Sequence, residues 1–198
     1  MSFQYEGSTE FKCNLHCHRC EATNKNGTRC RKSTCKMLPT CHIHSKSLYG
    51  VEVKTSTIPR SGLGLFACKE FKNEDIIAPY TGQLLTKREL DDRYGRENKE
   101  GDYAPYAVKM SENKYMDCAC ERGVASYANS NPSHNNSRFS VSNTTNTVNL
   151  KATKRIREGQ EIFVSYGKNY FKPNNAPHST VKKKVVEEGK RPCAKCGS

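Results

Sequence analysis

The stretch that decides the fold is Ile156-Arg157-Glu158-Gly159-Gln160-Glu161-Ile162-Phe163-Val164-Ser165-Tyr166-Gly167. Its Arg-Glu-Gly turn leads into a short apolar strand that ends on a tyrosine followed by a glycine. Two earlier segments belong with it, Ser61-Gly62-Leu63-Gly64-Leu65-Phe66-Ala67 and Ala125-Ser126-Tyr127-Ala128-Asn129-Ser130. A Gly-x-Gly turn or a Tyr-Gly strand end alone occurs in many folds. The three segments in this order are far more specific than any one of them.

The middle of the chain is typical of a mostly β protein. Short apolar runs rich in β-branched residues are separated by turn residues such as Asn73-Glu74-Asp75. The expected strands lie near residues 51–53, 76–80, 106–110, 138–141, 148–150 and 161–164. One short surface helix is expected over Thr86–Tyr94, because Thr86 is followed three residues later by Glu89, as in a capping box.

Length and composition bound the class of protein. A chain of 198 residues with 34% hydrophobic content can hold one compact domain with appendages. No apolar run is long enough for a membrane span, and the N-terminus lacks the pattern of a secretory signal, so we expect a soluble intracellular protein with no membrane contact. In that setting, the eleven cysteines indicate zinc rather than disulfides.

The net charge of +13 is concentrated at the two ends of the chain. Residues 1–50 carry eight Lys and Arg against three Asp and Glu, and residues 168–198 carry eight against two. Between them, seventeen basic residues nearly balance fifteen acidic ones. Two basic flanks around a nearly neutral centre favour contact with a polyanion, with nucleic acid as the commonest candidate. The alternative is a solvated surface with a disordered basic tail.

Residues 13–44 form a polar unit rich in Cys and His that is too small to bury a core, so its order is expected to come from metal. Cys20, Cys30, Cys41 and His44 are the candidate ligands of a tetrahedral zinc site. A second zinc site would use Cys13, Cys17 and Cys35, with His16 or His18. We therefore expect one or two zinc ions. Near the C-terminus, Cys193 and Cys196 make half a site, with a reduced cysteine pair as the alternative.

The three motifs together resemble those of the SET-domain protein lysine methyltransferases, over roughly residues 50 to 167. The resemblance implies a β-clip architecture of several small sheets, in which the segments of Asn129 and Tyr166 meet in a knot-like crossing. It also implies S-adenosylmethionine as the cofactor and methyl transfer to a lysine amine. The expected organisation is a zinc-binding module at 1–47, a SET domain at 48–167, and a basic tail at 168–198 with a partial post-SET-like Cys-x-x-Cys.

Methyl transfer to lysine needs a neutral amine, yet free lysine has a pKa of about 10.4. A narrow channel with aromatic walls lowers the amine pKa by disfavouring the charged form. The resemblance implies that Tyr166, Tyr80 and Tyr106 form the catalytic set. The residues that it implies for the cofactor are Gly62, Leu63, Gly64, Leu65, Tyr103, Tyr127, Asn129, Ser130 and Tyr166.

The expected function is a histone-tail methyltransferase that is nuclear or chromatin-associated, or located in the virion or host nucleus if the source is viral. The histone substrate is implied by the family and by no residue of this chain, and another protein, including a viral or ribosomal one, is the alternative substrate. The alternative is a catalytically silent SET-fold protein that binds chromatin or nucleic acid. Ser130 favours this alternative, because it stands where the family usually has histidine. The intact motif around Tyr166 argues against it.

Overall fold

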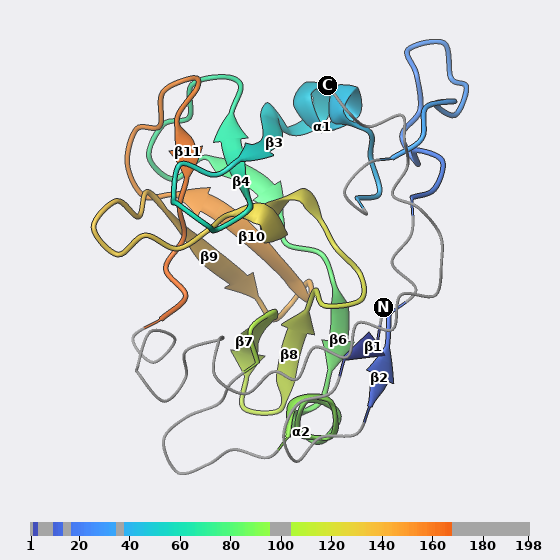
Figure 1. Cartoon of the computed structure of the whole chain (residues 1–198), viewed down its shortest axis with the longest axis vertical. Coiled ribbons are helices and arrows are strands. Elements are labelled where there is room, and N and C mark those ends of the chain that lie inside the picture. Colours follow the sequence, from blue (N-terminus) through green and yellow to red (C-terminus); the bar gives the residue numbers. More distant parts are fainter. Residues whose placement is uncertain (1, 4–9, 14–16, 35–37, 96–103, 168–198) are drawn as a thin grey trace. The chain divides into compact units, whose positions relative to one another are not determined.

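The computed structural model describes residues 2–3, 10–13, 17–34, 38–95 and 104–167. These residues fall into two compact units, each assembled from separate stretches of chain. Unit 1 takes the described residues that fall within Met1–Leu15, Gly82–Glu121 and Tyr166–Ser198, and unit 2 takes those within His16–Thr81 and Arg122–Ser165. Both units contain small antiparallel sheets (Figure 1). The expectation of a mostly β protein is confirmed.

One sheet of unit 2 has the order β11-β4-β3, with β3 at Val51–Thr55, β4 at Leu63–Ala67 and β11 at Glu161–Ile162. Strand β4 is central, because Leu65 pairs with Val53 on one side and Ile162 on the other. Leu65 and Ile162 are fully buried. The apolar part of the Ser61–Ala67 motif therefore lies in the core, and strand β4 is hydrogen-bonded to a neighbouring strand along both of its edges.

The second sheet of unit 2 has the order β5-β10-β9, with β5 at Ile76–Pro79, β9 at Ser137–Ser142 and β10 at Thr147–Ala152. Strands β9 and β10 form a hairpin whose turn ends at Asn146, with a φ of 52°. Along β10, Val148, Leu150 and Ala152 are buried in alternation with more exposed residues. This period of two gives the sheet one core-facing side.

Two helical segments complete unit 2. Helix α1 spans His42–Tyr49 and ends at Gly50, whose φ of 68° suits glycine. The single 3-10 turn η1 spans Val124–Tyr127 and leads directly to Asn129. Helix α1 follows the Cys/His-rich segment, and η1 brings the second motif toward β4 and β5.

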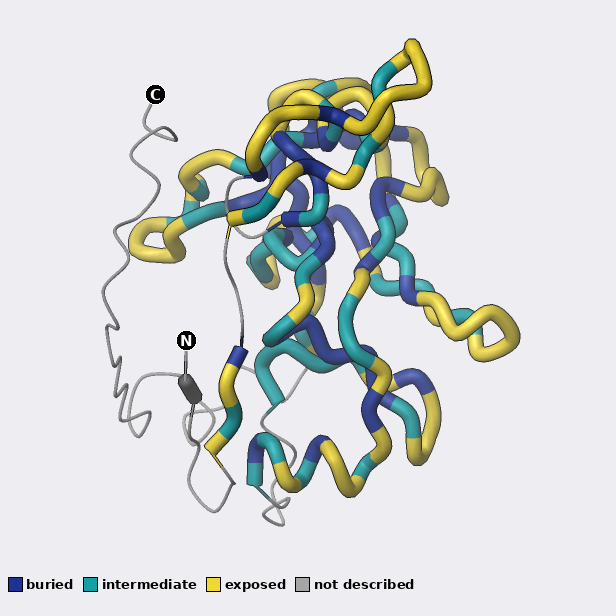
Figure 2. Tube along the Cα trace, turned by 90° about the vertical axis from the view of Figure 1, so that its right-hand side faces the viewer, coloured by how far each residue is buried: buried dark blue, intermediate teal, exposed yellow. Residues whose placement is uncertain are grey.

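Unit 1 contains the sheet β6-β8-β7, with β6 at Gln83–Leu85, β7 at Ala107–Ser111 and β8 at Lys114–Asp117. It also contains the two-residue strands β1 (Ser2–Phe3) and β2 (Phe11–Lys12) and helix α2 (Lys87–Tyr94). The capping box expected at Thr86 and Glu89 is present, which confirms the predicted helix. Helix α2 carries both buried and exposed positions (Figure 2), and its two buried residues, Leu90 and Tyr94, lie four positions apart on one face.

A buried charge organises unit 1. Asp117 has no exposed surface and accepts hydrogen bonds from the Tyr94 hydroxyl, at 2.9 and 3.0 Å, and from the Ala119 amide at 3.1 Å. Arg93 forms an ion pair with the same carboxylate at 2.5 Å. The guanidinium of Arg93 also lies 5.1 Å from the ring centroid of Phe11. Helix α2, strand β8 and the N-terminal strand β2 are thus joined through one charged pair.

None of the helices among the described residues is long and apolar enough to cross a membrane.

Candidate functional site

The glycine-rich turn leads into the start of β4, where Gly64 meets a carboxylate from the last motif. A Cβ atom on Gly64 would lie 2.1 Å from Oε1 of Glu161, closer than a real Cβ contact allows. Gly62 has a different constraint, because its φ is 71° and nothing lies within 4 Å of its Cβ position. Gly64 is therefore required for space, and Gly62 for its left-handed backbone.

Asn129 holds this turn from a third segment. Its side-chain amide donates to the carbonyl oxygen of Leu63 at 2.9 Å and to Oε1 of Glu161 at 3.3 Å. Its backbone carbonyl accepts from the amide of Val164 at 2.8 Å, and Asn129 forms a parallel bridge with Phe163. The structure thus brings together one residue from each of the three sequence motifs.

Glu161 is the centre of this contact, although the sequence motifs predicted no role for it. Its carboxylate accepts from the Ser56 hydroxyl at 2.7 Å, and from the amide of Thr57 at 2.7 Å and the hydroxyl of Thr57. The residue is 6% exposed. Burial raises the carboxyl pKa, but the hydrogen bonds from Thr57, Ser56 and Asn129 favour the charged form and hold the pKa of Glu161 below its ordinary value. The sequence did contain one sign of this role, because Glu161 is an acidic residue at the start of an otherwise apolar strand.

The segment 129–137 encloses the strand that ends the last motif. Asn136 donates from its side chain to the carbonyl of Glu161 at 2.9 Å and accepts from the amide of Phe163 at 2.9 Å. The amide of Ser137 donates to the carbonyl of Phe163 at 2.9 Å, and Ser137 bridges Val164 in parallel. Residues 161–164 are therefore bonded to both ends of this segment, in the crossing that the sequence analysis expected.

The predicted tyrosines fall in different units. Tyr80 lies in unit 2, is 6% exposed, and packs edge-on against Phe139 with ring centroids 4.8 Å apart. Tyr106 is half-buried in unit 1 and packs against the cluster of Leu85, Leu90, Tyr94, Tyr115 and Ala119. Tyr166 is half-buried and belongs to unit 1. Tyr103 lies outside the described residues.

The remaining predicted cofactor residues lie in unit 2. Tyr127 ends η1 and Ser130 follows Asn129, and both are half-buried. Leu65 is fully buried in the central strand β4, so its side chain packs in the core. The partly accessible members of the group are therefore Gly62, Leu63, Tyr127, Asn129 and Ser130.

The four expected zinc ligands form a compact cluster in unit 2. One ligand atom from each of Cys20, Cys30, Cys41 and His44 lies within 4.8 Å of the other three. Nδ1 of His44 is 3.6 Å from Sγ of Cys20 and 3.4 Å from Sγ of Cys41. Tetrahedral zinc, with Zn–S bonds of about 2.3 Å, separates its ligands by about 3.5–3.8 Å. The donor set and spacing therefore fit zinc.

Local structure explains why these ligands converge. Cys20 and Cys30 lie on opposite arms of a hairpin, Cys41 is the N-cap of α1, and His44 lies within its first turn. Burial raises the thiol pKa of Cys20, but backbone amides of Cys41 and Ala22 outweigh this and lower it. Burial raises the pKa of the Cys41 thiol. A thiol with a lowered pKa beside three further donors suits a metal better than a set of inert buried thiols does.

The second zinc site needs correction at Cys13. Its sulfur is bonded to that of Cys120 within unit 1, and a disulfide sulfur is not a thiolate ligand. Cys17 is exposed and belongs to no group of three metal ligands in the part of the chain that the structure describes. Cys35 and His16 lie outside the described residues, as do Cys193 and Cys196. His18 pairs with Glu21, with 3.3 Å between Nε2 and Oε1.

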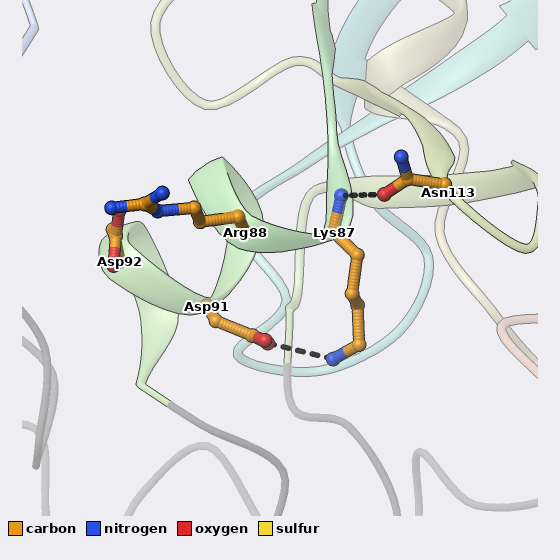
Figure 3. A pocket seen from close by; sticks show the side chains of 5 residues that line it. All are labelled: Lys87, Arg88, Asp91, Asp92 and Asn113. Atoms are coloured by element: carbon orange, nitrogen blue, oxygen red, sulfur yellow. Dashed lines mark hydrogen bonds and ion pairs between the residues drawn. The ribbon is translucent and has the colours of Figure 1, made fainter.

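A shallow polar depression lies beside α2, lined by Lys87, Arg88, Asp91, Asp92 and Asn113 (Figure 3). The Lys87 ammonium forms an ion pair with Asp91 at 2.6 Å, and the Lys87 amide donates to Asn113 at 3.0 Å. The depression contains none of the predicted site residues. It is a polar surface of α2, with one ion pair between Lys87 and Asp91.

Small antiparallel sheets joined by this crossing define a SET-type fold, and comparison with known proteins agrees. The sequence profile described as "SET domain" matches residues 62–167, just over half of the chain. The chain belongs to the SET-domain family.

Two curated relatives and one solved structure illustrate the similarity. The chain is 25% identical over 184 residues to the variant-silencing SET domain-containing protein of Plasmodium falciparum, covering 86% of this chain and 7% of that protein. It is 27% identical over 145 residues to histone-lysine N-methyltransferase EZH2 of Chaetomium thermophilum, covering 69% and 9%. It also resembles a chain in the crystal structure of the Chaetomium thermophilum polycomb repressive complex 2, with 26% identity, a TM-score of 0.52, and coverage of 64% and 16%. The chain therefore spans less than a tenth of these two curated relatives.

Proposed function

We propose that this protein transfers a methyl group from S-adenosylmethionine to a lysine amine of another protein. The observation that carries the proposal is the meeting of Leu63, Gly64, Asn129 and Glu161, which come from three separate motifs. These motifs lie within the residues that match the SET profile. The contact joins residues of all three motifs, and the last of these motifs also carries Tyr166.

The cofactor supplies an activated methyl group when it is bound. In this proposal, the backbone of Gly62, Leu63 and Gly64 approaches its methionine end, while Asn129 and Ser130 lie toward its adenine-bearing part. Asn129 already donates its side-chain amide to Leu63 and Glu161. Its side chain therefore positions the glycine turn, and its contribution to the cofactor comes through the backbone. Tyr103 and Tyr127 are proposed as the aromatic residues that contact S-adenosylmethionine.

Three tyrosines are proposed to handle the lysine substrate. Tyr80 and Tyr106 offer apolar ring faces along the lysine stem, and such walls disfavour the ammonium form. The hydroxyl of Tyr166 orients the neutral amine, and water removes the proton. By holding the amine in one orientation, these residues would remove much of the entropic barrier to its reaction. In this proposal, the rings of Tyr80 and Tyr106 desolvate the lysine side chain, and the hydroxyl of Tyr166 orients its amine.

A histone or another basic protein is the proposed substrate, which would dock as an added strand on a sheet edge. The support is that one relative is named a histone-lysine N-methyltransferase. A nuclear, chromatin-associated location follows from such a substrate. The two relatives described come from Plasmodium and Chaetomium, so they give no support to a viral source.

We also propose that the basic flanks contact nucleic acid, and that one zinc ion binds Cys20, Cys30, Cys41 and His44. Residues 1–47, 48–167 and 168–198 would then act as zinc module, SET domain and basic tail.

The decisive experiment incubates the protein and labelled cofactor with nucleosomes, free histones and bulk lysate protein. Label on a lysine of one of these substrates is expected. Tyr166→Phe should remove at least a hundredfold of the rate, because a positioned proton-handling group contributes about 10²–10⁴. Tyr49→Phe, a half-buried tyrosine at the end of α1, is the control and should retain activity. No label on any substrate, with folded protein, would contradict the proposal.

The second candidate function is a silent SET-fold protein that binds chromatin. Ser130 is the observation that favours it, because the family usually has histidine at this position. Calorimetry with S-adenosylmethionine separates the two functions. An enzyme gives a saturable heat of binding that weakens in Asn129→Ala, whereas a silent binder gives no heat.

A further inference from the structure

The hairpin formed by residues 18–34 carries a pair of crossed arginines. Its arms are joined by bridges between Arg19 and Ser33 and between Thr23 and Arg29. The guanidinium of Arg19 donates through Nε to the carbonyl of Cys30 at 2.8 Å, and through a terminal nitrogen to that of Arg29 at 2.9 Å. Arg29 does the reverse, donating to the carbonyls of Cys20 at 3.0 Å and Arg19 at 2.9 Å. Each arginine thus reaches across to the backbone of the other.

This exchange fixes two positive charges without neutralising them. A guanidinium has five N–H donors, and each of these uses two of them on neutral carbonyl oxygens. Both residues are exposed. Among the described residues, neither forms an ion pair with an acidic side chain. Two fixed like charges with unused donors favour an anion that can accept hydrogen bonds from both.

The surroundings of the pair extend the positive charge. Lys25, Arg31 and Lys32 are also exposed on this hairpin. The acidic residue of the hairpin is Glu21, and it pairs with His18. Positive charge spread along a hairpin matches a polymer of repeated anions better than a single small anion.

We propose that the crossed arginines Arg19 and Arg29 bind the phosphodiester backbone of a nucleic acid. The proposal rests on the nucleic-acid contact proposed above and narrows it to one surface, and it does not depend on methyl transfer. Phosphate oxygens accept the unused guanidinium donors of both residues, and Lys25, Arg31 and Lys32 contact neighbouring phosphates. Phosphate contacts of this kind give affinity without reading base sequence.

The arginine pair is hydrogen-bonded to the backbone of two residues of the Cys/His cluster. The carbonyls that receive the two Nε donors belong to Cys20 and Cys30, whose sulfurs are in the zinc-fitting group. A metal ion bound to these two cysteines would also fix their carbonyl oxygens, which accept the hydrogen bonds that orient the two guanidinium groups. Removing the metal should therefore weaken nucleic-acid binding even though neither arginine is a ligand.

The test measures binding of the full chain to a labelled 20-base-pair DNA duplex by fluorescence anisotropy at several salt concentrations. Arg19→Gln/Arg29→Gln should lower the slope of log affinity against log salt by about 2, with at least a tenfold loss of affinity at ~100 mM salt. Arg88→Gln/Arg157→Gln removes the same charge from exposed positions elsewhere and should leave the slope unchanged. Chelation of metal from the wild-type chain should also reduce affinity at least tenfold.

A second measurement uses wild-type protein, so it cannot be confounded by misfolding of a variant. Duplex DNA should protect Arg19 and Arg29, but not Arg88, from an arginine-selective dicarbonyl reagent, as read by peptide mass spectrometry. Duplex RNA of equal length is run in parallel, and the tighter ligand identifies the natural source of the phosphodiester.

Several results would overturn the proposal. If the wild type binds DNA but neither arginine is protected and the double variant matches its control, the nucleic-acid contact stands and this surface is wrong. If the wild type binds neither duplex, the contact and this surface both fail. If poly-glutamate competes as well as DNA at equal charge, the assignment to phosphate fails.

Discussion

The side-chain amide of Asn129 donates a 2.9 Å hydrogen bond to the carbonyl of Leu63, which lies 66 residues earlier in the chain. The same amide reaches the carboxylate of Glu161. Glycine at position 64 leaves room for both contacts. Residues of the three motifs therefore meet at one junction, formed by Leu63, Gly64, Asn129 and Glu161.

Gly64→Ala should be more harmful than Gly62→Ala, although both change a glycine of the same sequence motif. The new Cβ at position 64 meets Oε1 of Glu161 at 2.1 Å, and overpacking of this kind costs about 1–3 kcal/mol. At position 62 there is no clash, and the penalty is about 1–2 kcal/mol for a left-handed alanine. Urea denaturation gives both values. Cofactor binding should also fall further in Gly64→Ala, and equal effects in both assays would contradict the packing account.

Glu161→Gln should remove a pH-dependent part of the stability. Because the pKa of Glu161 is lowered in the folded state, its contribution is complete above the ordinary value of 4.5 and is lost as pH falls through the folded pKa. Charged hydrogen bonds of this type contribute about 1.5–3 kcal/mol. The variant should therefore differ most from wild type at pH 7 and converge with it in acid.

Glu74→Gln is the matched control for Glu161→Gln. Glu74 is 51% exposed and pairs with Arg138, so its loss should change the free energy of unfolding by less than about 1 kcal/mol at any pH. Denaturation curves at pH 7 and pH 3.5 make the comparison. A constant difference between Glu161→Gln and wild type across this range would show that the carboxylate charge is not what stabilises the junction.

Elemental analysis should find one zinc per chain held by the four-residue cluster. Cys41→Ser or His44→Ala should lose that ion, because tetrahedral zinc needs all four donors. Loss of metal should lower the melting temperature of the module and slow its reassembly. Cys17→Ser is the control, since Cys17 is exposed and outside the cluster, and it should retain the metal. Full zinc in His44→Ala would exclude this ligand set.

Arg93→Met should strongly destabilise unit 1. It leaves the carboxylate of Asp117 buried without its positive partner, which typically costs about 3–5 kcal/mol. Tyr94→Phe removes one neutral donor to the same carboxylate and should cost about 1–3 kcal/mol. Hydrogen exchange of the β8 amides measures the local effect. Arg88→Met, on the exposed side of α2, should leave that exchange unchanged.

The fold was predictable where the sequence pattern is local. The capping box at Thr86, the alternation along β10 and the apolar strand at Glu161–Ile162 each follow from neighbouring residues. Helix α1 was not expected, because its sequence lacks a clear apolar period. Its start is set by Cys41, which joins a cluster formed with a distant hairpin.

The candidate site was predictable only in part. The motif supplied Gly64 and Asn129, but their shared partner Glu161 depends on contacts with Ser56 and Thr57 more than a hundred residues earlier. Cysteine spacing gave the four-residue cluster correctly. It could not give the bond between Cys13 and Cys120, because spacing does not determine pairing.

The long separation between Thr57 and Glu161, 104 residues, also matters during synthesis. While the ribosome is still translating the intervening residues, β4 can pair with β3 but lacks its other neighbour, and the amide and hydroxyl of Thr57 lack their acceptor. The nascent chain therefore exposes an open strand edge until the last motif leaves the exit tunnel. A chaperone that shields this edge during translation would increase the yield of folded protein.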